Sequence, residues 1–304
     1  MRHPILWLPL EVASDRHLAV GRRLVRRGLP PVGGIAIHDR VVPASGGTAG
    51  PRIVLYERPD RTRPTGALLW IHGGGLVLGT PEQDHRWCSS LADELGILVV
   101  SVDYRLAPEH PYPAGLDDCM AALAWLHHHA DELGVDTTRV AVGGASAGGG
   151  LAAAVALRAR DEGGPPLCFQ LLNYPMLDDR TVLADDHQGR GELVWTPASN
   201  RFGWTAYLGD APRPDHAVPY AAPGRATDLS NLPPAWIGVG DLDLFHAEDL
   251  DYATRLRAAG VECELVEEPG MYHGADQLAT RAARMRAYRA AMVEALRRAT
   301  AERV

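Results

Sequence analysis

A serine flanked by small residues carries the sharpest chemical signal in this sequence. Residues 144–148 read G-A-S-A-G, directly after the apolar run 140–142 and before a stretch rich in alanine and leucine. In a G-x-S-x-G turn from strand to helix, small residues on either side allow the close approach that projects the serine outward. The helix N-terminus adds positive partial charge where an oxyanion would form. The motif predicts that Ser146 is a nucleophile in acyl transfer, and a turn that only packs helix against strand is the alternative.

A second motif could hold a negatively charged oxygen. Residues 72–75 read H-G-G-G, immediately after the apolar run 67–71. Consecutive glycines at the end of a strand leave backbone N–H groups unshielded, and removing one donor of this kind costs about 10² to 10³ in rate. The two motifs in this order indicate an acyl-transfer hydrolase. His72 lies too close to the strand to be the base, so we expect His72 and Gly73 to orient the loop.

Serine needs a base, and the base needs a third group to orient it. The apolar run 235–239 leads into Asp241 and Asp243, and His273 is the only histidine after the last apolar run, 263–266. The order Ser, Asp, His is that of α/β-hydrolases. We therefore expect His273 to be the base. The residues alone do not decide whether Asp241 or Asp243 orients the base, because either could instead cap the helix expected from about residue 248.

Short apolar runs alternate with helical patterns along the chain, which predicts an α/β fold with a mostly parallel sheet and helices on both faces. The expected strands are 67–71, 97–102, 140–142, 169–172, 235–239 and 263–266, and the expected helices are 84–95, 117–133, 147–160 and 248–259. Residues 1 to about 45 and about 178 to 225 do not join this pattern. We interpret the second stretch as an insertion over the sheet, so that 1–304 form one domain.

Composition excludes several other classes of protein. The 304 residues carry 30 Lys+Arg and 38 Asp+Glu, a formal net charge of −8, with no long basic tract. This argues against nucleic acid as the main partner, because binding phosphates needs clustered positive charge. No segment approaches the roughly 20 apolar residues that span a bilayer, so no stable membrane insertion is expected. The widely spaced cysteines include no C-x-x-C pair, so we expect no metal site, a reducing environment and a cytoplasmic protein.

Together these motifs resemble the bacterial hormone-sensitive-lipase-like esterases, a branch of the α/β-hydrolases marked by the H-G-G-G loop. Residues 102–114 read V-D-Y-R-L-A-P-E-H-P-Y-P-A, which is similar to the family block D-Y-R-L-A-P-E-x-x-x-P-A. The resemblance covers roughly residues 65 to 280. It implies an α/β-hydrolase fold with a helical cap, contributed by about 1–45 and about 178–225.

The resemblance also implies roles for individual residues. It selects Asp243 as the orienting acid, since the family's aspartate precedes a Tyr-Ala-x-x-Leu helix by nine residues and its histidine by about thirty. The oxyanion donors that it implies are the backbone N–H groups of Gly74, Gly75 and Ala147. The chain departs from the family pattern at Ala145, Leu244 and Ala275, which leaves the shape of the pocket open.

The sequence thus predicts a serine carboxylic-ester hydrolase that acts on small esters of short to medium acyl chain and needs no cofactor. The alternatives are a deacetylase of an N- or O-acetylated small molecule and a non-catalytic ligand receptor on the same fold. Five residues could line the site that binds the acyl chain, and each could equally pack the cap onto the sheet: Leu76, Trp7, Trp195, Phe202 and Trp204. The expected last helix, 278–301, carries an apolar stripe of Met285, Tyr288, Met292 and Leu296. We expect this stripe to pack into the core rather than to form a dimer surface, and a homodimer stays possible.

Overall fold

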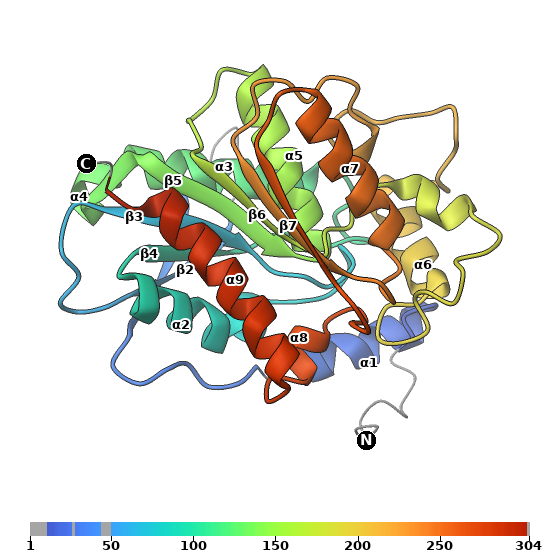
Figure 1. Cartoon of the computed structure of the whole chain (residues 1–304), viewed down its shortest axis with the longest axis horizontal. Helices are drawn as coiled ribbons and strands as arrows, with labels where there is room; N and C mark the ends of the chain where they lie inside the picture. The colour runs from blue at the N-terminus through green and yellow to red at the C-terminus, as the bar shows by residue number, and fades with distance from the viewer. Residues whose placement is uncertain (1–10, 26–27, 44–49, 303–304) are drawn as a thin grey trace.

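The computed structural model describes residues 11–25, 28–43 and 50–302, and these build an eight-stranded sheet (Figure 1). Its strand order is β1-β2-β4-β3-β5-β6-β7-β8. Strand β2 pairs antiparallel with both β1 and β4, and every other pair is parallel. This confirms the mostly parallel sheet. The strands are β1 Ala36–Val41, β2 Arg52–Glu57, β3 Thr65–Ile71, β4 Leu98–Asp103, β5 Val135–Ala145, β6 Phe169–Asn173, β7 Ala235–Gly240 and β8 Cys263–Glu268.

Helices cover both faces of this sheet, as the alternating pattern predicts (Figure 1). On one face lie α3 Ala114–His128, α5 Ala147–Asp161 and α7 His246–Ala258; on the other lie α2 His85–Leu95 and α9 Ala283–Thr300. The stripe Met285, Tyr288, Met292 and Leu296 of α9 is buried in the core. Its apolar character therefore reflects packing inside this chain.

The helix expected over 117–133 is two helices, because α3 ends at His128 and α4 Ala130–Leu133 follows. At the break, the backbone N–H of His129 bonds the carbonyl of Trp125, and ring atom Nδ1 lies 2.9 Å from the same oxygen. The imidazole also stacks on the Trp125 ring. The helix expected over 278–301 begins later in the structure, as α9, and Leu278 is instead the last residue of the short helix α8 Ala275–Leu278.

Strand β1 differs from the expectation that residues 1 to about 45 belong to a cap. It pairs with β2 at the edge of the sheet, and its last four residues are exposed. An exposed edge strand carries polar side chains, so it shows no buried apolar run in the sequence. Strand β2, by contrast, is buried along its central four residues.

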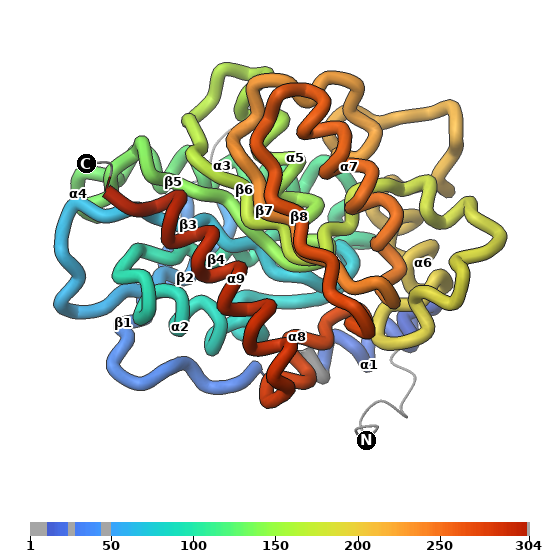
Figure 2. Tube along the Cα trace, in the orientation of Figure 1, coloured from blue at the N-terminus to red at the C-terminus, as the bar shows by residue number. Residues whose placement is uncertain are grey.

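Helices α1 Asp15–Val25 and α6 Pro197–Leu208 lie beside each other at the end of the sheet where the parallel strands finish (Figure 2). The N–H of Val12 donates to Ser199 Oγ at 3.0 Å and joins the two segments. Helix α6 begins at Thr196, whose side chain accepts from the Ser199 N–H, and ends at the left-handed Gly209. Short 3₁₀ turns flank these segments at Pro81–Asp84, Asp179–Leu183 and Pro223–Arg225. None of the described helices is long and apolar enough to cross a bilayer.

Candidate active site

The turn between β5 and α5 holds Ser146 in an unusual backbone conformation. Its φ is +58° and its ψ is −124°, a backbone region that residues other than glycine rarely adopt. The Ser146 N–H donates to the carbonyl of Asn173 at the end of β6, at 2.9 Å. Bonds from the neighbouring strand therefore hold this backbone in place, and strain of this kind is concentrated at functional sites.

Glycine is required on both sides of the serine. A Cβ atom on Gly144 would lie 2.4 Å from the backbone of Gly148, and one on Gly148 would lie 2.0 Å from the carbonyl oxygen of Ile71. No side chain fits at such distances, so helix α5 can approach β3 only through these glycines. The G-x-S-x-G spacing is thus a packing requirement of this turn.

Ser146, His273 and Asp243 form a continuous hydrogen-bonded row, although they follow three different strands. Nε2 of His273 lies 2.9 Å from Oγ of Ser146, and Nδ1 lies 2.8 Å from Oδ2 of Asp243. A carboxylate can only accept, so Nδ1 carries the proton and Nε2 is left to accept the proton of the hydroxyl. The exposed fractions are 6% for Ser146, 5% for His273 and 0% for Asp243. The structure brings these predicted residues together away from bulk water.

The two candidate aspartates have different surroundings. Oδ1 of Asp243 accepts from the N–H of Phe245 at 3.0 Å, while its other oxygen faces His273. Asp241 is partly exposed, and its Oδ1 accepts from the N–H of Gly270 at 2.6 Å. Of the two, only Asp243 bonds the imidazole, in agreement with the choice that the family resemblance implied.

The glycine loop after β3 packs directly on the nucleophile turn. A Cβ on Gly73 would lie 3.3 Å from the Ser146 Cβ. Gly74 has a φ of +130° and Gly75 a φ of +60°, and neither conformation suits a bulkier residue. Within the described residues, the N–H groups of Gly74, Gly75 and Ala147 have no protein acceptor. Donors without partners beside Ser146 are suited to an oxygen that gains negative charge.

His72 contacts this loop from within the core. Its Nδ1 donates to the carbonyl of Gly73 at 2.9 Å, and Nε2 of Gln83 donates to the same oxygen at 3.2 Å. The ring stacks on Tyr104 with 4.3 Å between centroids, and the Tyr104 hydroxyl donates to the His72 carbonyl. Burial lowers the pKa of His72 to about 4, so this imidazole is neutral at physiological pH.

Two aromatic rings beside His273 were not anticipated from the sequence. Tyr174 and Phe245 both meet the imidazole edge to face, with centroid distances of 4.7 Å and 5.2 Å. Tyr174 directly follows the buried strand β6, and Phe245 follows the buried strand β7 after a short loop. Side chains at the carboxyl ends of parallel strands gather at one edge of a sheet, and that signal could have identified both.

A family model described as the alpha/beta hydrolase fold matches residues 68–277, more than half of the chain. The carboxylesterase NlhH of Mycobacterium tuberculosis is 41% identical over 244 residues, which cover 79% of this chain and 75% of that relative. The esterase LipI of the same organism is 39% identical over 243 residues, with the same shares covered.

Among solved structures, a bacterial heroin esterase superposes with a TM-score of 0.88 at 38% identity, covering 95% of this chain and 94% of that one. The esterase LipW from Mycobacterium marinum gives a TM-score of 0.83 at 34% identity, covering 98% and 95%. The chain belongs to the hormone-sensitive-lipase-like esterases of the α/β-hydrolase fold. The resemblance stated from its motifs is confirmed.

In this esterase-family chain, one stretch of the insertion lies beside three loops of the site. Gly191 donates its N–H to the carbonyl of Leu242 and packs against Leu244, beside Asp243. Farther along, a Cβ on Gly274 would contact the Val194 side chain at 3.9 Å. The indole of Trp195 occupies the position that a Cβ on Gly75 would take. Residues 191–195, named here the strap, therefore touch the acid, histidine and glycine loops in turn.

The predicted substrate-binding residues fall into different environments. Leu76 and Trp195 are buried next to the glycine loop, and Phe202 is partly buried on α6. Trp204 lies fully inside the core, edge to face with Tyr207. For Trp204, packing the cap onto the sheet is thus the role that its contacts describe. Trp7 lies outside the described residues.

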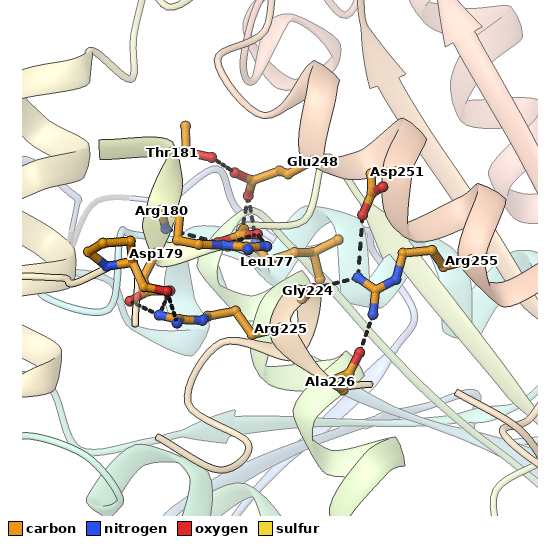
Figure 3. Close-up of polar contacts among 12 residues, drawn as sticks. Leu177, Asp179, Arg180, Thr181, Gly224, Arg225, Ala226, Glu248, Asp251 and Arg255 are labelled. Atoms are coloured by element: carbon orange, nitrogen blue, oxygen red, sulfur yellow. Dashed lines mark hydrogen bonds and ion pairs between the residues drawn. The ribbon is translucent and has the colours of Figure 1, made fainter. Parts of the chain in front are cut away.

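Charged side chains anchor the insertion to α7 and to its own far end (Figure 3). Arg225 forms a buried ion pair with Asp179 at 3.1 Å and also donates to the carbonyls of Arg213 and His216. Glu248 on α7 accepts from the N–H of Leu177 at 2.7 Å. Its other oxygen accepts from the hydroxyl of Thr181, and burial raises the pKa of Glu248 well above its usual range. The cap is thus attached through side chains that contact none of the reacting groups.

Proposed function

We propose that this chain hydrolyses carboxylic esters of small molecules through an acyl-enzyme on Ser146. One observation carries the proposal: a hydrogen-bonded row runs from Oδ2 of Asp243 through His273 to Oγ of Ser146, at 2.8 Å and 2.9 Å. These distances are within the reach that proton transfer requires. Membership of an esterase family supports the same reaction class.

The first half of the reaction forms the acyl-enzyme. Nε2 of His273 takes the hydroxyl proton of Ser146 while Oγ bonds to the ester carbonyl carbon. Asp243 stabilises the resulting imidazolium through Nδ1–H and keeps the ring in the correct tautomer. The carbon–oxygen bond to the alcohol then breaks, and the alcohol leaves with the proton from Nε2. In the second half, water gives its proton to Nε2 and attacks the acyl carbon, which releases the acid and restores Ser146.

The negative charge of each tetrahedral intermediate needs donors that are already in position. The N–H groups of Gly74, Gly75 and Ala147 fit this role, because they lie beside the serine without protein acceptors. His72 and Gln83 hold the Gly73 carbonyl and thereby support the loop. Fixed donors of this kind need no reorganisation when charge develops.

The cap favours substrates of short to medium acyl chain. Ser146 is buried, and Trp195 of the strap and Gly203 of α6 both lie against Gly75 of the neighbouring glycine loop. A covered site of this kind accepts dispersed small esters more readily than an oil surface. In this proposal Leu76, Trp195 and Phe202 line the acyl site, whereas Trp204 holds the cap to the core.

Hydrolysis of p-nitrophenyl esters from acetate to palmitate tests the proposal. Wild type should cleave the shorter members, and Ser146→Ala should fall to the background rate. Ser101→Ala is the matched control, because Ser101 is also fully buried but lies on β4. That variant should keep wild-type turnover. A wild-type protein that cleaves no ester of the series, or a Ser146→Ala variant that retains turnover, would contradict the proposal.

A further inference from the structure

The end of strand β6 and the residue after it contact the backbone of Ser146 and the ring of His273. The carbonyl of Asn173 accepts the N–H of Ser146, as described above. Its side-chain Nδ2 donates to Oδ2 of Asp276 at 3.4 Å, and Oδ1 accepts from the hydroxyl of Tyr288 at 2.6 Å. One residue therefore bonds the nucleophile turn through its backbone and helix α8 through its side chain.

The next residue, Tyr174, makes a parallel pair of contacts. Its hydroxyl donates to Oδ1 of Asp276 at 2.8 Å, and its ring meets the imidazole of His273 edge to face. The backbone N–H donates to the carbonyl of Gly238 on β7 at 2.7 Å. Its φ of +37° is uncommon for a tyrosine, so these contacts hold it in a conformation that the isolated chain disfavours.

Asp276 is the point at which these contacts converge. It lies three residues after His273, in the first turn of α8, and its side chain is buried. The donors to its carboxyl group are neutral side chains from β6 and the residue that follows, aided by the charge of Arg289 at longer range. Burial raises the pKa of this carboxyl group. Any movement of α8 would carry His273 with it, since only Gly274 lies between them.

We propose that Asn173 and Tyr174 act through Asp276 as positioning residues that fix His273 relative to Ser146. The inference rests on the proposed function, because it concerns the proton transfer between these two side chains. The nucleophile and the base come from strands that are not neighbours, β5 and β8, and β6 lies between them in the sheet next to β5. The residues at the end of β6 thus lie between the two segments, and their contacts set the distance from Oγ of Ser146 to Nε2 of His273.

A double-mutant cycle on turnover tests this inference. Tyr174→Phe keeps the ring against His273 and removes only the hydroxyl that bonds Asp276, and Asp276→Ala removes the acceptor. We expect each variant to lower kcat about tenfold with KM within about twofold, because a slightly misplaced base slows the chemical step. The double variant should lose no more than the worse single variant, since both remove the same contact.

Tyr252→Phe is the matched control, because Tyr252 is fully buried and its hydroxyl has no partner among the described residues. It should leave kcat within about twofold, and its effect should multiply with that of Asp276→Ala, as for independent sites. Titration of active sites with an organophosphonate gives kcat per reactive serine, so that a loss of folded protein does not count as slower chemistry.

Three results would overturn the inference. Unchanged kcat per labelled site in both Tyr174→Phe and Asp276→Ala would contradict it, and so would losses that multiply in the double variant. If Asp276→Ala does not fold, Tyr174→Phe alone decides between tenfold loss and no loss. A wild-type protein that is neither labelled nor active would contradict the proposed function and this inference with it, whereas an active wild type with unaffected variants contradicts the inference alone.

Discussion

The carboxyl groups on the reaction side of the molecule and the Asp179–Arg225 pair of the cap are buried in different surroundings. Near the site, Asp276 accepts from the hydroxyl of Tyr174 and Asp84 accepts from Nε1 of Trp70, both neutral donors at 2.8 Å. In the cap, Asp179 is paired with the guanidinium of Arg225 (Figure 3). An arginine keeps its charge at every pH of interest, whereas a carboxyl group bound by neutral donors can exist in either protonation state.

This difference separates two kinds of sensitivity. On the reaction side, burial raises the pKa of Asp276, and it raises the pKa of Asp84 to about 6, so the protonation of Asp84 changes within an accessible pH range. In the cap, burial also raises the pKa of Asp179 despite Arg225, so removing the arginine would leave a carboxyl group that is costly to keep buried. The Asp84 carboxyl group should therefore respond to pH, and the Asp179–Arg225 pair to loss of its cation.

The largest effect should come from Asp243→Asn, which keeps the shape of a reaction-side carboxyl group and removes its charge. An amide at this position favours the wrong tautomer of His273, and kcat should fall about 10⁴-fold. Asp241→Asn is the control, because its carboxyl group bonds the Gly270 N–H and not the imidazole. Steady-state kinetics should show less than about a tenfold loss in the control. Equal losses in the two variants would remove the distinction between these aspartates.

Arg225→Ala should have the largest effect on stability. Breaking a buried ion pair by removing one partner costs about 3 to 5 kcal/mol, and the carbonyls of Arg213 and His216 lose a donor as well. Arg213→Ala removes an exposed arginine from a surface pair with Asp210 and should change the free energy of unfolding by less than about 1 kcal/mol. Urea denaturation measures both. Similar losses would mean that burial of the pair adds nothing to the attachment of the cap.

Asp84→Asn should reveal the pH sensitivity of the reaction side. Burial raises the pKa of Asp84 from 3.8 to about 6. The folded protein therefore binds more protons than the unfolded chain between these values, and stability is fully present below pH 3.8 and is lost as pH rises through 6. Asparagine still accepts from Trp70 but does not titrate. Between pH 3.5 and 7.5 wild type should lose about 3 kcal/mol relative to the variant.

Unfolding curves of both proteins at several pH values provide the measurement. A difference between wild type and Asp84→Asn that stays constant with pH would show that this carboxyl group does not titrate in the folded protein over that range.

The smallest predicted effect concerns the contact between the cap and the glycine loop. A Cβ on Gly203 of α6 would lie 2.6 Å from the carbonyl oxygen of Gly75. Gly203→Ala should displace that loop and lower kcat roughly tenfold, although alanine favours a helix interior by about 1 kcal/mol over glycine. Lower kcat together with somewhat lower thermal stability is the expected combination, because displacing backbone atoms costs more than this helix preference gains. Full turnover in this variant would show that the cap does not influence the oxyanion donors.

Local motifs were sufficient to predict two of the three residues that the structure joins in one hydrogen-bonded row, Ser146 and His273. Ser146 and His273 each follow a buried strand, and parallel strands deliver the residues after them to one edge of the sheet. The glycines at 144 and 148 are required by backbone contacts that any chain with this turn must make. The spacing of nearby residues is therefore enough to predict the nucleophile turn and the position of the histidine.

The supporting contacts could not be predicted in the same way. The bond from Tyr174 to Asp276 joins residues 102 positions apart, and the pair of Asp179 with Arg225 joins residues 46 apart. Neither partner in such a pair carries a local signal, because aspartates, tyrosines and arginines are common in loops. The aromatic residues of the insertion illustrate the same limit, since Trp195 touches the glycine loop and Trp204 is part of the core. Only the folded chain distinguishes these roles.

The base reaches the nucleophile across 127 positions of sequence, and it is delivered by β8, the last strand and an edge of the sheet. A growing chain thus has no complete site until β8 and His273 have been synthesised, and a refolding chain has none until this distant strand has docked. Contacts between residues so far apart in sequence form slowly. Recovery of turnover after dilution from denaturant is therefore a stricter measure of complete folding than recovery of the helical circular-dichroism signal. Helices that precede β8 in the sequence contribute to that signal.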